Sequence, residues 1–198
     1  MMVNESVLEI KAYIEKHLEE GVRSLCVEKG ELCLTVKVEN LESVLIFLRN
    51  SCKFLQLSDI CGVDYPDRDD RFEVVYHLLN MYKNLRIRVK ISVEEHVEVP
   101  SVCRLFKAAN WFEREVFDMY GIPFKNHPDL RRILTAYEFQ GYPLRKDFPA
   151  YGEVEVFYNE AERTVVYEPV RLNQRYRKYQ FEGPWSAPVY EIGDDKDG

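Results

Sequence analysis

The sequence predicts an α+β protein with a mainly antiparallel sheet, helices packed on one face of that sheet, and an extended carboxyl-terminal arm. Apolar residues recur at helical spacing near the amino terminus, several later segments alternate between apolar and polar residues, and the character of the chain changes after Gly152. We expect one domain over residues 1–152, with the order helix, two strands, helix, three strands, helix. The arm is expected over residues 153–198.

The first half of the domain is predicted from helical spacing and one tight turn. The first helix has its apolar face at Val7, Ile10, Ile14 and Leu18, and Gly21 ends it. A hairpin follows, in which VRSLCVE and ELCLTVKV are joined by Lys29-Gly30. Asn40 is placed to cap a second helix, whose apolar stripe is Leu41, Val44, Leu45 and Leu48.

Three further strands are expected from Phe54 onward. The segments KFLQLSDICGVDY and FEVVYHLL flank the polar turn PDRDD, and LRIRVKISV then alternates strictly. Its polar face carries Arg86, Arg88 and Lys90, which we expect to be partly covered by polar contacts with a partner. Simple solvent exposure of this face is the alternative. Pro100 ends the strand, and residues 102–120 are predicted to form one or two helices.

Composition and charge argue against several classes of function. The 198 residues are 46% hydrophobic and 31% charged with a net charge of -7, which is typical of a soluble globular protein and gives no basic field for nucleic acid or anionic lipid. No apolar run approaches the roughly 18 residues that span a bilayer. The acidic, amphipathic start has neither the features of a secretory signal nor those of a transit peptide. These observations predict a protein made and kept in the bacterial cytoplasm.

The five cysteines give no pattern of a disulfide framework or metal site. They are Cys26, Cys33, Cys52, Cys61 and Cys103, with long gaps and no C-x-x-C pair. Structural zinc and iron–sulfur sites usually need closer clustering. We therefore expect reduced, mostly buried apolar side chains.

The segment ANWFEREVFDMYGIPFKNHPDLRRIL, residues 109–134, concentrates charge among large apolar residues. Its helical core face is predicted at Phe112, Val116, Met119 and Tyr120, and Gly121 and Pro123 end the helix. Arg114 and Asp118 are i,i+4 neighbours that can pair, and Glu115 is expected on the same face as Asp118. Asp129 is expected near the start of a further turn, where a carboxylate is stabilised.

Three interpretations of this segment remain open. A hydrolase could use Glu115 and Asp118 as acid and base with His127 as a proton shuttle, and Arg131 could hold an anion. No nucleophile motif or phosphate-binding glycine loop accompanies them, and His127 precedes a proline, where a histidine more often bonds the backbone. The segment could also be a solvated charged face. A charged, aromatic docking surface is favoured, because protein interfaces are enriched in Arg, Trp and Tyr.

The arm is rich in aromatic residues, and disordered tails are poor in them. It has no persistent helical period, and ERTVVYEPV is at most one short strand. Such an arm orders only when a large surface receives it, which predicts a partner protein. A second interpretation is that the arm binds nucleic acid, with tyrosines stacking on the bases and with phosphate contacts from Arg171, Arg175, Arg177 and Lys178. The overall acidity of the chain opposes this interpretation.

Three segments of the sequence resemble a known family. FEREVFDMYGIPFKNHPDLRRIL, FQGYPLRKDFP and VVYEPVRLNQRYRKYQFEGPW are similar to the C subunit, or thirty-kilodalton subunit, of proton-translocating NADH:quinone oxidoreductase, which is respiratory complex I. The resemblance implies a non-catalytic structural or assembly subunit in the hydrophilic arm of an enzyme that couples electron transfer from NADH to quinone with proton translocation. The corresponding subunit of a related quinone reductase or energy-converting hydrogenase is the alternative.

The resemblance also implies what the chain contains and contacts. NAD, FMN, iron–sulfur clusters and quinone would belong to neighbouring subunits, and this chain would hold no cofactor, metal or catalytic residue. It would bind the D subunit of complex I, with the B and I subunits nearby, without nucleic acid or membrane insertion, on the cytoplasmic side of the bacterial inner membrane. The motif positions expected to dock or to form internal salt bridges are Glu113, Arg114, Glu115, Asp118, Tyr120, His127, Pro128, Asp129, Arg131, Arg132, Arg145, Lys146 and Asp147. The expected arm anchors are Tyr167, Pro169, Arg171 and Trp185.

Overall fold

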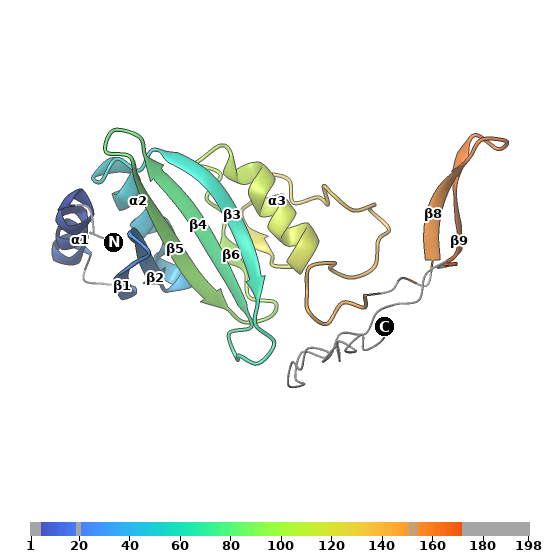
Figure 1. Cartoon of the computed structure of the whole chain (residues 1–198), viewed down its shortest axis with the longest axis horizontal. Helices are drawn as coiled ribbons and strands as arrows, with labels where there is room; N and C mark the ends of the chain where they lie inside the picture. Colours follow the sequence, from blue (N-terminus) through green and yellow to red (C-terminus); the bar gives the residue numbers. More distant parts are fainter. Residues whose placement is uncertain (1–4, 19–20, 151, 153, 172–198) are drawn as a thin grey trace, which may run out of the picture. The chain divides into compact units, whose positions relative to one another are not determined.

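The computed structural model describes residues 5–18, 21–150, 152 and 154–171, and the chain divides into two units, Met1–Phe148 and Pro149–Gly198 (Figure 1). The predicted order of helices and strands in the first unit is confirmed, with two short strands, β6 and β7, in addition. The elements are α1 (Glu5–His17), β1 (Val22–Glu28), β2 (Glu31–Val36), the 3₁₀ helix η1 (Val38–Asn40), α2 (Leu41–Asn50), β3 (Gln56–Asp64), β4 (Phe72–Asn80), β5 (Leu85–Val93), β6 (Val99–Pro100), α3 (Ala109–Tyr120) and β7 (Phe124–Lys125).

The main sheet has five strands in the order β1-β2-β5-β4-β3. Strands β2 and β5 pair in parallel, whereas β1–β2, β5–β4 and β4–β3 are antiparallel, so the predicted mainly antiparallel sheet is confirmed. Figure 1 shows β5, β4 and β3 side by side. None of the described helices is both long enough and apolar enough to cross a membrane.

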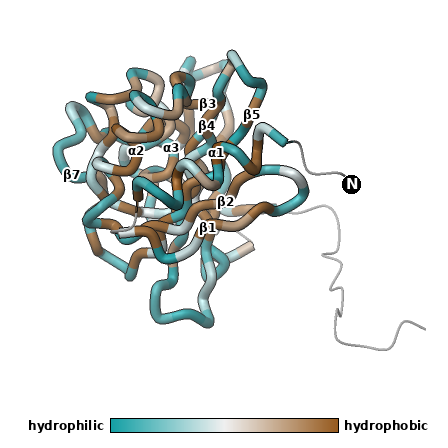
Figure 2. The backbone as a smooth tube through the Cα atoms, turned by 90° about the vertical axis from the view of Figure 1, so that its left-hand side faces the viewer, coloured by the Kyte–Doolittle hydropathy of each residue, from teal (hydrophilic) through white to brown (hydrophobic). Residues whose placement is uncertain are grey.

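One face of this sheet carries the core, as the strict alternation in β5 predicts. Ile87, Val89 and Ile91 of β5 are fully buried and lie opposite Leu78, Tyr76 and Val74 of β4, which are buried on the same face. Buried residues of α1, α2 and α3 join the same core cluster, which confirms that the helices pack on one face of the sheet. In Figure 2 the hydrophobic positions concentrate in the strands and in α2, and the turns are mostly hydrophilic.

The opposite sheet face is polar. Arg88 lies 3.5 Å from Glu31 and Lys90 lies 3.7 Å from Glu73, whereas Arg86 is exposed. Two of the three predicted cations therefore have carboxylate neighbours within the chain itself. Their contact with a partner protein stays a prediction.

Asn40 stands at the N-cap position of α2, but its side chain makes no capping hydrogen bond. The preceding η1 turn holds Asn40 at φ -100° and ψ 1° instead of the extended conformation that a capping side chain needs. The Asn40 side chain lies against Gly21, where an added Cβ would be 2.1 Å from Nδ2. Gly21 also has φ +88°, so both space and backbone conformation require glycine there.

The described part of the second unit is an antiparallel hairpin of β8 (Val154–Asn159) and β9 (Thr164–Pro169). The prediction that ERTVVYEPV forms at most one short strand is confirmed by β9, but its partner strand β8 was not predicted. The missed signal is a polar turn between two alternating segments: Asn159 Oδ1 accepts the backbone N–H of Ala161 at 3.0 Å, and Arg163 adopts φ 52°. The proposed anchor Trp185 and the basic residues Arg175, Arg177 and Lys178 lie outside the described residues.

Candidate functional site

Helix α3 supports the charged segment that the sequence singles out. It begins at Ala109 rather than near residue 102, because residues 101–108 form turns. Its predicted core face is confirmed, since Val116 and Met119 are buried and Phe112 and Tyr120 pack partly buried against the core. Gly121 ends the helix at φ 74°, and a Cβ there would be 2.5 Å from the Tyr142 ring. The helix also buries two carboxylates fully, which apolar periodicity alone does not predict.

Asp118 is the first of these carboxylates, and it binds the loop that follows the helix. Its Oδ2 accepts the backbone N–H groups of Ile133, Leu134 and Thr135 at 2.9, 2.7 and 2.9 Å. Its Oδ1 accepts Arg132 Nη1 at 2.8 Å and the Thr135 hydroxyl at 2.5 Å. Three successive N–H groups on one carboxylate fix the path of residues 132–135 without any regular secondary structure.

Two opposing effects act on the pKa of Asp118. Burial raises it, but the hydrogen bonds from Thr135, Ile133 and Leu134 outweigh burial and hold the pKa well below its usual range. Asp118 is therefore ionised at neutral pH and pairs with Arg132. The Arg132 guanidinium also donates to Gly141 O at 3.1 Å and lies over the Phe139 and Tyr142 rings. This one arginine connects α3 to the next turn of the loop.

The predicted i,i+4 pair of Arg114 and Asp118 is wrong. Arg114 Nε donates to Arg131 O at 2.9 Å and Nη2 donates to Arg132 O at 3.2 Å. The guanidinium also lies 5.2 Å from the centre of the Trp111 ring. Asp118 points into the protein, toward the loop, so its side chain cannot share the exposed side of the helix with Arg114. Tertiary packing has replaced the helical pair.

Glu113 is the second buried carboxylate, and it holds the turn before the helix. It accepts the Ser101 hydroxyl at 2.6 Å and the Val102 N–H at 2.7 Å. Burial raises the pKa of Glu113 against these hydrogen bonds, which lower it. His127 lies 3.9 Å away with its side chain fully buried, while its Nδ1 accepts the Asp129 N–H and its Nε2 lies 3.1 Å from Asn110 O. The prediction that His127 bonds the backbone is confirmed.

The structure does not assemble the hydrolase that the sequence left open. Glu115 is exposed on α3 while Asp118 is fully buried, so the two carboxylates do not share a face as predicted. Among the described residues, His127 makes its contacts with the Glu113 side of the helix and with backbone groups. The acid, base and shuttle roles therefore have no common location.

A second set of contacts attaches residues 142–148 to the sheet. Arg145 Nε donates to Tyr120 O at 2.6 Å, Nη1 donates to Glu95 at 2.5 Å, and the guanidinium lies over the Phe72 and Tyr142 rings. Only 11% of its side chain is exposed. Arg145 is thus a largely covered scaffold residue in the described structure.

Asp64, at the end of β3, is a member of this network that the sequence analysis missed. It makes a bidentate pair with Arg71, at 2.8 and 3.0 Å, and accepts the Lys146 N–H at 2.7 Å. Arg71 lies 3.0 Å from Asp147. The hydrogen bond from Arg71 lowers the pKa of Asp64, and the reciprocal bond raises the pKa of Arg71. The useful signal was the polar segment DYPDRDDR, which has more charge than a simple turn needs.

Two predicted positions lie at the surface. Asp129 and Arg131 form an exposed pair at 2.7 Å, with side chains 43% and 63% exposed. The predicted turn after Pro128 is not helical, and the chain from 128 to 134 is irregular. Exposed ion pairs of this kind add little stability, so these two residues are available for contact with another molecule.

Large apolar side chains project from the same part of the chain. Trp111, Leu134, Tyr137 and Leu144 are each between 52% and 73% exposed. They occur on α3 and on the loop that Asp118 and Arg132 hold in place. We call α3 together with residues 127–148 the α3–loop region.

Comparison with known proteins identifies the same family as the three sequence segments quoted above. Residues 34–154 match the family described as the 30-kDa subunit of respiratory-chain NADH dehydrogenase. The chain belongs to this family. The resemblance that the sequence indicates is confirmed, and the matched range includes most of the sheet, α3 and the loop.

Similar proteins match over nearly the whole chain. The C subunit of the NADH-quinone oxidoreductase of Hyphomonas neptunium is 52% identical, with 98% of each chain covered. The corresponding protein of Maricaulis maris is 50% identical over the same share. The alternative of a related reductase or hydrogenase is not favoured, because relatives this similar carry the NADH-quinone oxidoreductase name.

Two solved structures share the fold. A trypsin-resistant fragment of Nqo5 is 32% identical with a TM-score of 0.52, covering 65% of this chain and all of that chain. The structure of the membrane-bound sulfane sulfur reductase, an archaeal respiratory membrane complex, contains a chain 26% identical with a TM-score of 0.63, covering 74% of this chain and 87% of that one. The fold thus occurs in more than one respiratory complex.

Proposed function

We propose that the chain is a non-catalytic subunit in the hydrophilic arm of NADH:quinone oxidoreductase, and that its role is to dock and hold neighbouring subunits. The observation that carries this proposal is the α3–loop region. Asp118, Arg132 and Arg145 fix an irregular loop with charges that are largely covered. The same loop exposes large apolar side chains. A rigid loop with exposed aromatic residues is suited to binding a preformed protein surface.

The motif residues then divide into two groups, which sequence alone cannot separate. Scaffold residues have their polar groups engaged inside the chain, and we assign Glu113, Arg114, Asp118, Tyr120, His127, Arg132 and Arg145 to this group. Docking residues are exposed or paired only at the surface, and we assign Glu115, Pro128, Asp129 and Arg131 to this group. Lys146 and Asp147 border both groups, because the Lys146 backbone N–H donates to Asp64 and the Asp147 carboxylate pairs with Arg71, while both residues are exposed.

The hairpin of the second unit supports a second docking element. Val156, Tyr158, Val165 and Tyr167 fall on one face of the hairpin, by register, and are 54–63% exposed. Pro169 shares that face, so two of the expected arm anchors lie on it. A two-stranded hairpin alone is marginally stable in water. An exposed apolar face on such a hairpin favours burial against a partner.

The partner and location that we propose follow from the family. The D subunit of complex I is the proposed main partner, with the B and I subunits nearby, and the electron carriers are placed in those neighbours and not in this chain. The protein would lie on the cytoplasmic side of the bacterial inner membrane, attached through the complex. Binding of nucleic acid is not proposed, since the net charge is -7.

Co-purification with the D subunit of the same genome tests this proposal. The tagged full-length chain is expressed beside that protein and compared with the variants Tyr137→Ala and Leu134→Ala and with a chain that lacks residues 153–198. Tyr82→Ala is the matched control, because Tyr82 is 79% exposed in the distant β4–β5 turn. We expect each loop variant and the truncation to recover less of the D subunit and the control to recover as much as wild type.

The proposal is overturned if all of these proteins recover the D subunit equally well. It is also overturned in part if the isolated chain shows a flavin or iron–sulfur chromophore, because the protein would then be an electron carrier. A circular dichroism spectrum of every variant separates lost docking from lost folding.

A further inference from the structure

Two groups of side chains in the described part of the chain are close enough to share a metal ion. One is Cys103, Glu113 and His127, and the other is Cys26, Glu28 and Cys33. In the first group Glu113 already accepts Ser101 and Val102, and both His127 ring nitrogens contact backbone groups. An ion there would have to displace the contacts that hold α3. The second group has no such structural role.

The hairpin of β1 and β2 brings Cys26 and Cys33 together. Its turn is Lys29-Gly30, at φ 53° and φ 86°, which is the backbone of a tight two-residue turn. Counting back from this turn, Cys26 and Cys33 are direct cross-strand partners, and Glu28 lies two residues from Cys26 on the same face. The pair is not recognisable from the sequence, because six residues separate the two cysteines whereas a C-x-x-C motif has only two.

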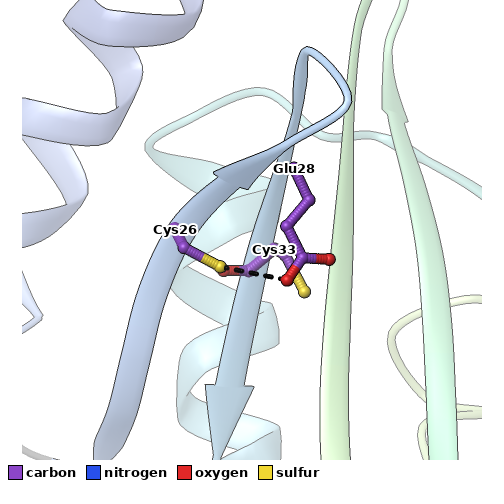
Figure 3. A group of neighbouring side chains, drawn as sticks. All are labelled: Cys26, Glu28 and Cys33. Carbon is purple, nitrogen blue, oxygen red and sulfur yellow. Dashed lines mark hydrogen bonds between the residues drawn. The ribbon is translucent and has the colours of Figure 1, made fainter.

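We propose that Cys26, Cys33 and Glu28 form a binding site for a thiophilic divalent cation, with Zn²⁺ as the natural occupant. Figure 3 shows the three side chains converging beside the hairpin, and their ligand atoms all lie within 4.8 Å of one another. Two sulfurs on one tetrahedral Zn²⁺ are about 3.8 Å apart, from Zn–S bonds of about 2.3 Å. Small side-chain rotations provide that distance. Water would complete the four ligands, as in zinc sites with three protein ligands.

The charges around the site are compatible with two thiolates. Cys33 is the β2 residue paired with Arg88 of β5, and Lys90 lies next along the same face. Arg88 Nε is buried and has no hydrogen-bond partner within the described structure. Two thiolates and one carboxylate with a divalent cation carry one net negative charge, and Arg88, which also pairs with Glu31 at 3.5 Å, and Lys90 provide positive charge on the same sheet face. On binding, each thiol loses its proton to solvent and no redox change occurs.

The polar contacts that the Cys26 sulfur already makes are weak, so a metal ion can replace them. Cys26 Sγ lies 3.6 Å from Glu28 Oε1 and 3.7 Å from Cys33 O. These sulfur contacts are weaker than the hydrogen bonds that engage Glu113 and His127. The site also lies on the polar sheet face, away from the α3–loop region. It is therefore independent of the proposed docking function.

Titration of the reduced full-length chain with Cd²⁺ tests the proposal. Cadmium is the probe because its thiolate complexes absorb in the ultraviolet through ligand-to-metal charge transfer. We expect this band to saturate at a single ion per chain, added Zn²⁺ to remove it, and Zn²⁺ to raise the thermal unfolding midpoint. Cys26→Ser and the double variant C26S/C33S should lose both the band and the Zn²⁺-dependent shift of the midpoint.

Cys61→Ser is the matched control. Cys61 also lies on the polar face and is 2.9 Å from the Asp59 carboxylate, but it is on β3 at the opposite edge of the sheet and has no second cysteine opposite. This variant should keep the band. The proposal is overturned if wild type shows no band, or if the band survives in the double variant. Cys26 is only partly buried, so Cys26→Ser decides the outcome even where Cys33→Ser disturbs folding.

Discussion

The Asp118 carboxylate on α3 and the Arg132 guanidinium, fourteen residues later, form a 2.8 Å ion pair in which the carboxylate is fully buried and only 16% of the arginine side chain is exposed. Burial of a charge is unfavourable unless hydrogen bonds satisfy it. Here the carboxylate receives three backbone N–H groups and a hydroxyl as well. The pair is therefore the point at which the irregular loop is attached to the helix.

Asp118→Asn should strongly destabilise the chain. The substitution removes the charge that Arg132 neutralises and places an amide NH₂ among groups that are all donors. Breaking a buried ion pair typically costs about 3–5 kcal/mol. Urea unfolding of the full-length chain, followed by circular dichroism, measures this. Asp129→Asn is the control, because its pair with Arg131 is at the surface, and a loss of stability equal to that of Asp118→Asn would contradict the account.

The stability of wild type should also fall in acid because of Asp118. Its folded pKa is held below the unfolded value of about 3.9. Between these two values the unfolded chain binds the additional proton, so stability rises with pH in that window. The contribution is complete above about pH 5, and it is lost as pH falls through the folded pKa. Unfolding free energies measured between neutral pH and pH 3 should show the gap between wild type and Asp118→Asn narrowing only at the acid end.

The sheet was the part of the fold that could be predicted best. Strict alternation in LRIRVKISV determines which residues are buried, and β5 follows it. The two-residue turn at Lys29-Gly30 was equally predictable, since it needs positive φ at both positions. Both signals are local, because residues adjacent in the sequence determine the burial pattern of the strand and the conformation of the turn.

The contacts of the α3–loop region could not be predicted in the same way. Asp118 pairs with a residue fourteen positions away instead of the available Arg114, and Asp64 accepts the N–H of Lys146, 82 positions later. Such pairs depend on how the sheet and helix pack, and the hydrophobic periodicity of the sequence gives no information about that packing. Family resemblance identified the relevant residues, but only the structure separates those that support the loop from those that are exposed.

Gly62→Ala should disturb the packing of α3 on β3. A Cβ at Gly62 would be 2.5 Å from the Tyr120 ring, which is too close for any real contact. Tyr120 cannot move freely, because its carbonyl accepts Arg145 and its ring packs against the core. Overpacking of this kind typically costs about 1–3 kcal/mol. In a double-mutant cycle with Tyr120→Ala, the Gly62→Ala penalty should largely disappear, and a strictly additive result would show that the contact is not the cause.

Val156→Asp on the β8–β9 hairpin should weaken assembly without changing the stability of the first unit. Val156 and Tyr167 are cross-strand partners on the exposed apolar face, so a carboxylate there would have to be desolvated when a partner covers that face. Thr164→Asp is the control, because Thr164 is exposed on the opposite face of the same hairpin. Urea unfolding should give the same midpoint for wild type and both variants, while the co-purified D subunit should fall for Val156→Asp alone. If both variants recovered equally less of the D subunit, the added negative charge would weaken binding from either face of the hairpin. The apolar face would then not be the docking surface.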